Sequence, residues 1–92
     1  MSSSSAPRFT EKQGQYLAFI ATYTLLHRRP PAEADFQRFF QVTPPAIHQM
    51  IVELERRGLI SRVPGQPRSI TVTLPADELP QLQPIKTSAA RY

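Results

Sequence analysis

The segment from Thr43 to Leu74 limits the fold more than any other part of the sequence. Thr43 can cap a helix that begins at Pro44, because proline is favoured in a first helical turn, and Gly58 provides its stop. Two short strands around a basic, proline-containing turn are expected next, at residues 59–63 and 69–74 with the turn at 64–68. A helix followed directly by such a hairpin is the second half of a winged helix-turn-helix.

The residues before this segment predict two more helices. Thr10 and Gln13 have the spacing of a capping box, which predicts that a first helix begins at Thr10. Arg28 and Arg29 suit the end of this helix, and Pro30-Pro31 forbid its continuation. A second, short helix is expected at 32–40, where three phenylalanines share a face. The expected apolar face of the first helix comprises Tyr16, Leu17, Phe19, Ile20, Tyr23 and Leu26. We therefore predict a mainly α fold with a small β-hairpin, that is, three helices plus a wing.

The chain divides into three regions by composition. Residues 1–9 are predicted to be a disordered N-terminus, 10–75 the winged helix-turn-helix domain, and 76–92 a proline-containing extended tail. The tail carries three separated apolar residues, which are expected to dock on the domain or to contact a second chain: Leu79, Leu82 and Ile85.

Size and charge narrow the class of protein. A chain of 92 residues suits one small domain, and a net charge of +4 is consistent with a polyanionic partner such as DNA. No apolar run approaches the roughly 18 to 20 residues of a membrane span, and there is no cysteine. His27 and His48 are isolated from other metal-binding residues. We expect a cytoplasmic protein that is not an enzyme and needs no metal or cofactor.

The outward face of the helix at 44–57 carries the candidate base-reading residues. Gln49 can pair with adenine, Ala46 can touch a thymine methyl group, and His48 can bond guanine or a phosphate. Thr43 can meet a phosphate at the helix N-terminus as well as cap the helix. The alternative is that these side chains are solvent-exposed helix residues with no binding role. The full set of expected contacts on and before this helix is Thr43, Pro45, Ala46, His48, Gln49 and Val52.

The turn at 64–68 is expected to touch the DNA backbone or the minor groove. Arg62, Gln66 and Arg68 bracket this turn and can bond phosphates. A solvated hairpin tip explains the same three residues equally well.

Several short motifs together resemble the N-terminal DNA-binding domain of the LexA repressor. They are Phe9-Thr10-Glu11-Lys12-Gln13, Arg29-Pro30-Pro31, Thr43-Pro44 and Glu55-Arg56-Arg57-Gly58-Leu59-Ile60. The resemblance covers roughly residues 9–74 and implies a winged helix whose third helix reads DNA. The repressor's second domain, with its Ser/Lys self-cleaving peptidase, is expected to be absent from this chain.

The chain departs from the family pattern in four places, and those at Pro45 and His48-Gln49 are positions that read bases in the family. Ala32 stands where the family has a threonine cap, and Pro45 replaces an asparagine. His48-Gln49 replaces a pair of glutamates. The loop before Thr43 is one residue shorter than in the pattern. We therefore expect this chain to recognise a different operator.

Two functions remain open from the sequence. The first is a sequence-specific, double-stranded DNA-binding transcriptional regulator of bacterial or mobile-element origin, acting as a homodimer or with a partner protein. The second is a winged-helix module that binds protein and does not read DNA. Glu53 and the lack of Arg or Lys before Arg56 on the third helix favour the second, whereas the arginines of the wing favour the first.

Overall fold

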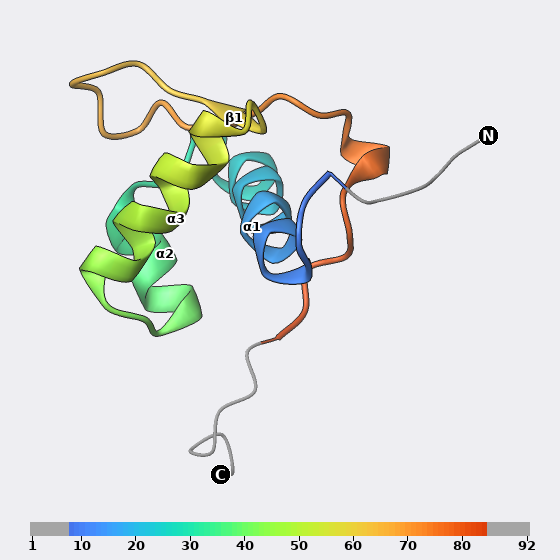
Figure 1. Cartoon of the computed structure of the whole chain (residues 1–92), viewed down its shortest axis with the longest axis horizontal. Coiled ribbons are helices and arrows are strands. Elements are labelled where there is room, and N and C mark those ends of the chain that lie inside the picture. The colour runs from blue at the N-terminus through green and yellow to red at the C-terminus, as the bar shows by residue number, and fades with distance from the viewer. Residues whose placement is uncertain (1–7, 85–92) are drawn as a thin grey trace, which may run out of the picture.

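The computed structural model describes residues 8–84, and in this part of the chain three α-helices precede a two-stranded antiparallel sheet (Figure 1). The elements are α1 Glu11–His27, α2 Glu33–Phe40, α3 Pro44–Arg56, β1 Ile60–Ser61, β2 Thr71–Val72 and a short 3-10 helix, η1, Ala76–Glu78. The hairpin β1–β2 with its connecting turn forms the wing. The predicted fold, mainly helical with a small hairpin, is confirmed.

Local hydrogen bonds fix both ends of α1. The N–H of Gln13 donates to Thr10 Oγ1 at 3.1 Å, and the N–H of Thr10 donates to Gln13 Oε1 at 3.0 Å, which completes the predicted capping box. At the other end Arg28 adopts the left-handed conformation, with φ of 60°, and its N–H donates to the carbonyl of Thr24. Pro30 and Pro31 follow, so the helix cannot continue.

The expected apolar face of α1 is wrong at its C-terminal end. Leu26 is 71% exposed and Leu25 is 78% exposed. The reason is geometric: the first half of α1 crosses the core, whereas no other described element covers the last turn. Helical spacing identifies a face, but it does not say how far along the helix that face stays covered.

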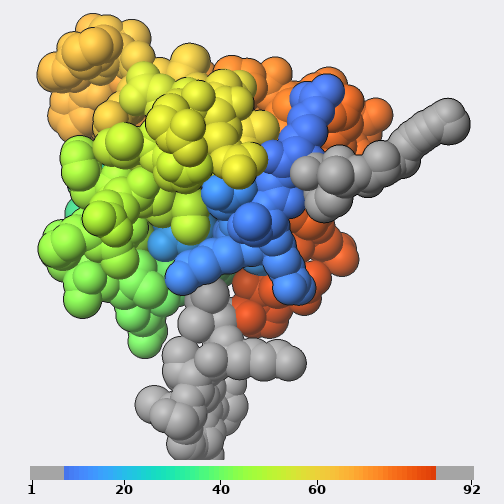
Figure 2. All heavy atoms as spheres, in the orientation of Figure 1, coloured from blue at the N-terminus to red at the C-terminus, as the bar shows by residue number. Residues whose placement is uncertain are grey.

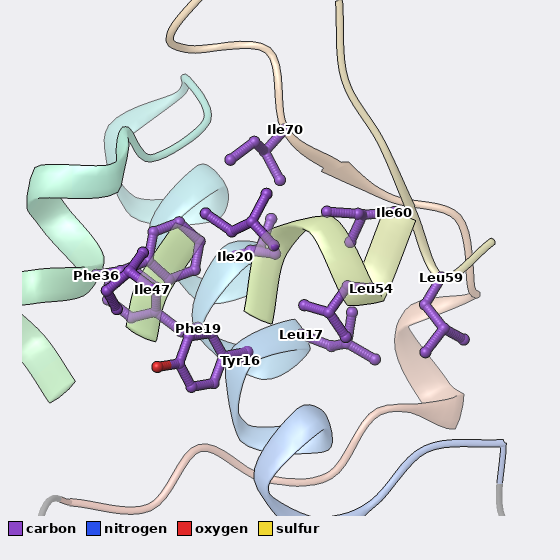
Figure 3. Close-up of a cluster of buried hydrophobic side chains, with 11 residues drawn as sticks. Tyr16, Leu17, Phe19, Ile20, Phe36, Ile47, Leu54, Leu59, Ile60 and Ile70 are labelled. Atoms are coloured by element: carbon purple, nitrogen blue, oxygen red, sulfur yellow. The ribbon is translucent and has the colours of Figure 1, made fainter. Parts of the chain in front are cut away.

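The core lies where α1, α2, α3 and the hairpin meet (Figure 3). Its fully buried side chains come from the three helices: Tyr16, Leu17, Ile20, Phe36, Ile47, Ile51 and Leu54. The hairpin and the residues beside its strands add Leu59, Ile60 and Ile70, which are also buried. Aromatic packing joins α1 to α2, since the rings of Tyr16 and Phe40 stack with centroids 4.2 Å apart. Each α3 residue in this core lies on one stripe of the helix, so the opposite stripe must face outward.

The turns around α2 and α3 use different caps. The N–H of Ala32 donates to Asp35 Oδ2 at 2.8 Å, and Gln41 ends α2 in the left-handed conformation. Thr43 occupies the cap position of α3 as predicted, but its hydroxyl makes no capping hydrogen bond. Gly58 has a φ of +75°, which confirms it as the glycine stop after α3.

The strands are shorter than the sequence pattern predicts. Ile60 pairs with Val72, and the N–H of Thr73 donates to the Leu59 carbonyl at 3.0 Å, but regular pairing ends at Ser61. Beyond it the Ser69 hydroxyl accepts the N–H of Val63 at 2.8 Å, so a side chain takes the place of a ladder bond. Pairing is therefore confined to the base of the hairpin, and the rest of the wing is an irregular loop.

The described part of the tail packs against α1. The Gln15 side chain donates to the Gln81 carbonyl at 3.0 Å and accepts the N–H of Gln83 at 2.7 Å. Leu79 and Leu82, two of the apolar tail residues expected to dock on the domain or on a second chain, are half-buried against the core. The third apolar tail residue, Ile85, lies outside the described residues.

Gly14 explains why both ends of the described chain lie so close to α1. A Cβ atom at Gly14 would sit 2.9 Å from a ring carbon of Phe9 and 3.0 Å from Pro80 Cγ. Only glycine allows both to approach the helix this closely. Phe9, expected in the disordered N-terminus, is thus part of the packed body, while residues 1–7 lie outside the described range.

Candidate nucleic-acid interface

The outer stripe of α3 is open to solvent along its whole length. No other described segment covers the green-yellow surface of α3 in Figure 2. All the outward residues that the helical spacing predicts are exposed: Pro45, Ala46, His48, Gln49 and Val52. The structure thus brings these five expected contacts together on one face, beside the wing (Figure 1).

The middle of this face forms a shallow hollow that is both polar and apolar. It is lined by His48, Gln49, Val52 and Glu53. Val52 is 42% exposed, which leaves an apolar surface next to the amide of Gln49. An amide beside an aliphatic group matches the edge of an A·T pair, which presents a donor and an acceptor on adenine and a methyl group on thymine.

His48 has a partner on the neighbouring helix. Its Nδ1 lies 3.4 Å from Oε2 of Glu33, the first residue of α2, and both side chains are about half exposed. Glu33 was not among the residues that the sequence singled out. Nothing in the local pattern could reveal it, because the two residues are 15 positions apart and meet only when α2 packs on α3.

Glu53, the acidic residue on the outer face of α3, forms ion pairs with two arginines of the same chain segment. Glu53 accepts from Arg56 Nη2 at 2.7 Å and from Arg57 Nε at 3.0 Å. These hydrogen bonds, that of Arg56 first, hold the pKa of Glu53 below its ordinary value. Glu53 therefore stays ionised, but its charge is balanced by the two arginines that also suit the C-terminal end of the helix dipole.

The N-terminus of α3 offers few donors for a phosphate. A helix normally presents its first free N–H groups there, but Pro44 and Pro45 have none. The Thr43 hydroxyl makes no capping bond and is exposed, so it and the nearby N–H of Ala46 are the groups left to meet an anion. The expected phosphate contact of Thr43 would therefore depend on its hydroxyl and on a single neighbouring N–H group.

The first arginine of the wing is paired with α3. Arg62 Nε donates to Glu55 Oε1 at 2.9 Å, and the arginine side chain is only 26% exposed. This pair ties the beginning of the wing loop to the helix. Arg62 can reach a phosphate only by giving up its ion pair with Glu55.

Arg68 faces the body of the protein. Its Nη1 donates to Asp35 Oδ2 at 3.0 Å and to the Pro30 carbonyl at 3.1 Å, and lies 3.4 Å from the Tyr23 hydroxyl. Burial raises the pKa of Asp35, but the N–H of Ala32 and the charge of Arg68 outweigh it, so the pKa lies below its ordinary value. Arg68 therefore joins the wing to the loop between α1 and α2.

The tip of the wing carries little charge. It projects as a separate lobe at the upper left of Figure 2. Gln66 is exposed there, and its N–H closes the turn by donating to the Val63 carbonyl at 3.0 Å. Of the three expected wing contacts, Gln66 is the one whose side chain is not held by an ion pair within the described residues.

Residues 8–84 contain neither a metal-binding cluster nor a membrane-spanning helix. No group of three or more His, Cys, Asp or Glu side chains there is placed to hold a metal ion. No helix in that range has the length and hydropathy needed to cross a membrane.

Known proteins match the same part of the chain that builds this face. The relatives include the LexA repressors of Thermosipho melanesiensis (35% identical over 65 residues), Thermotoga neapolitana (36% over 64) and Thermotoga maritima (31% over 64). These matches cover 70–71% of this chain but only 32–33% of each relative. The chain therefore spans about a third of the length of these repressors.

The family model of the LexA DNA-binding domain matches residues 6–69, which include all three helices and the wing up to Ser69. This range contains every residue of the candidate interface. The chain belongs to the LexA DNA-binding domain family.

Proposed function

We propose that this protein is a sequence-specific, double-stranded DNA-binding transcriptional regulator. The observation that carries the proposal is the uncovered outer stripe of α3, with exposed reading groups beside a projecting wing, in a member of a DNA-binding family. In this proposal α3 enters the major groove, and the turn at 64–68 lies on the backbone or in the minor groove.

The roles of the residues follow from their surroundings. Gln49 pairs with adenine, and Ala46 and Val52 contact thymine methyl groups. His48 bonds a base edge, Pro45 packs against the backbone, and the Thr43 hydroxyl bonds a phosphate. Gln66 meets the backbone from the tip of the wing. Arg62 reaches a phosphate by leaving Glu55. Arg68 stays bound to Asp35 and contributes to DNA binding indirectly, by holding the wing in position.

The charge pattern supports a binder that depends on base contacts more than on phosphate contacts. Four arginines near α3 and the wing are paired with carboxylates: Arg56, Arg57, Arg62 and Arg68. Each unpaired cation that meets a phosphate releases counterions and steepens the salt dependence. We therefore expect a shallow salt dependence for a protein of net charge +4.

We also propose that two copies, or one copy and a partner protein, share the operator. One α3 touches only a few base pairs, and each good base contact contributes roughly 1 to 3 kcal/mol. Light scattering with and without the preferred duplex tests this directly. A particle that stays monomeric in both states contradicts it.

The direct test is selection from a randomised duplex pool at low and moderate salt. An enriched motif that is lost in Gln49→Ala, with unchanged folding, supports sequence reading by α3. Retention of DNA without any enriched motif contradicts a sequence-reading function. No retention at low salt favours the alternative, a winged-helix module that binds protein.

A further inference from the structure

The contact between His48 and Glu33 lies at the edge of the candidate interface. His48 is in the second turn of α3, on its exposed stripe, and Glu33 opens α2 beneath it. Nδ1 of His48 is 3.4 Å from Glu33 Oε2. The nitrogen that Glu33 faces is therefore Nδ1, and the second ring nitrogen, Nε2, remains for another partner.

A carboxylate can only accept hydrogen bonds, so Glu33 favours a proton on Nδ1 of His48. In the neutral ring the other nitrogen, Nε2, then has no proton and acts as an acceptor. In the protonated ring Nε2 carries a proton and acts as a donor. The state of the ring thus decides which kind of base edge Nε2 can meet.

We propose that Glu33 is a specificity-determining residue, which sets the base preference of His48 by fixing its hydrogen-bonding state. This inference rests on the proposed function, since it requires α3 to lie in the major groove. Neutral His48 meets donors, which are the amino groups of adenine and cytosine there. Protonated His48 meets acceptors; guanine offers two of them, N7 and O6, whereas adenine offers only N7 and thymine only O4.

The neighbouring charged groups leave Glu33 as the partner that acts on the ring. Glu53, on α3, lines the same hollow as His48 but is bound by Arg56 and Arg57. Arg62, on the wing, borders a groove together with Glu33 but is bound to Glu55. Among the described residues, the carboxylate of Glu33 has no arginine or lysine within ion-pair distance.

The test compares base preferences selected from a randomised duplex pool by the whole chain at about pH 8 and about pH 5.5, because histidine is the side chain whose charge changes between pH 5 and 8. At the base that meets His48 we expect adenine or cytosine at the higher pH. Guanine gains roughly three- to tenfold at the lower pH, the ratio expected for one net hydrogen bond.

The key variant is Glu33→Gln, because an amide can donate as well as accept and no longer fixes the ring. We expect guanine to gain roughly three- to tenfold at this base already at pH 8. Glu11→Gln is the matched control, since it removes the same charge at the same position of α1. It should reproduce the wild-type preference, and His48→Gln should remove the dependence on pH.

Two negative results have different meanings. An enriched motif that is identical in wild type and Glu33→Gln at both pH values overturns this inference and leaves the proposed function standing. The absence of any enriched motif overturns both.

Discussion

The outer stripe of α3 and the wing were both expected to contact DNA, yet their side chains are arranged differently. On α3 the expected residues face solvent, as for Gln49 and Val52. On the wing the two arginines face the protein, Arg62 toward Glu55 and Arg68 toward Asp35. The difference separates a surface that is ready to bind from a loop whose charges hold it in place.

The comparison teaches that the direction in which a side chain points is easier to predict on a helix than on a loop. Burial of Ile47, Ile51 and Leu54 forces the remaining α3 side chains outward, because the helical period relates all of them. No such relation constrains Arg68, whose direction depends on a carboxylate 33 residues away.

The largest expected effect on stability concerns Asp35, which binds Arg68 of the wing. Asp35→Ala removes the acceptor for both Ala32 and Arg68, and the aspartate side chain is only 10% exposed, so we expect a loss of about 3 kcal/mol in the free energy of unfolding. Arg68→Ala should destabilise in the same direction. Urea unfolding measures both, with Gln66→Ala as the control that leaves stability unchanged. Unfolding midpoints that do not move would make Arg68 a solvated wing residue.

The next effect concerns the α3 face. Gln49→Ala should reduce affinity for the selected duplex by about 2 kcal/mol, or roughly 30-fold, because a bidentate base contact is lost. Its stability should stay within about 0.5 kcal/mol of wild type, since Gln49 is exposed. Fluorescence polarisation on selected and scrambled duplexes measures the affinities. Equal loss on the two duplexes would mean that Gln49 does not read sequence.

A smaller effect is expected in acid. Because the pKa of Asp35 is lowered in the folded protein, its charge stabilises the fold above the ordinary value of 3.8, and this contribution disappears as the pH falls through the lower folded value. Asp35→Asn should therefore show a flatter loss of stability below about pH 4. Thermal unfolding across this range is the measurement. Parallel curves for the two proteins would show that the charge of Asp35 is unimportant.

The smallest effect concerns the other wing arginine. Arg62→Ala should change stability by less than about 1 kcal/mol, because its ion pair with Glu55 is partly exposed. If Arg62 moves to a phosphate on binding, the slope of affinity against salt should fall by about one unit. An unchanged slope would show that Arg62 stays with Glu55 in the complex.

The parts of the fold that the sequence predicts correctly depend on short-range rules. The capping box of Thr10 and Gln13 and the glycine stop at Gly58 involve neighbours in the chain. These features require only a few residues each, so they can be recognised without knowing the rest of the structure.

The parts that were wrong or missed depend on distant contacts. Leu26 fits the helical pattern but lies beyond the reach of the core. The apolar residues of the tail were expected to dock on the domain or on a second chain, but the place where the tail docks depends on Gln15 and Gly14 of α1, far away in the sequence. The Glu33–His48 contact at the interface is of the same kind, since it exists only through the packing of α2 on α3.

The central claim is that the α3 stripe and the tip of the wing form the contact surface. Amide chemical-shift mapping of the whole chain with its selected duplex tests it most directly. We predict that the largest shifts fall at residues 43–52 and 64–67, with small shifts at the exposed end of α1 around Leu25 and Leu26. Shifts concentrated at that end of α1, with α3 unaffected, would contradict the claim.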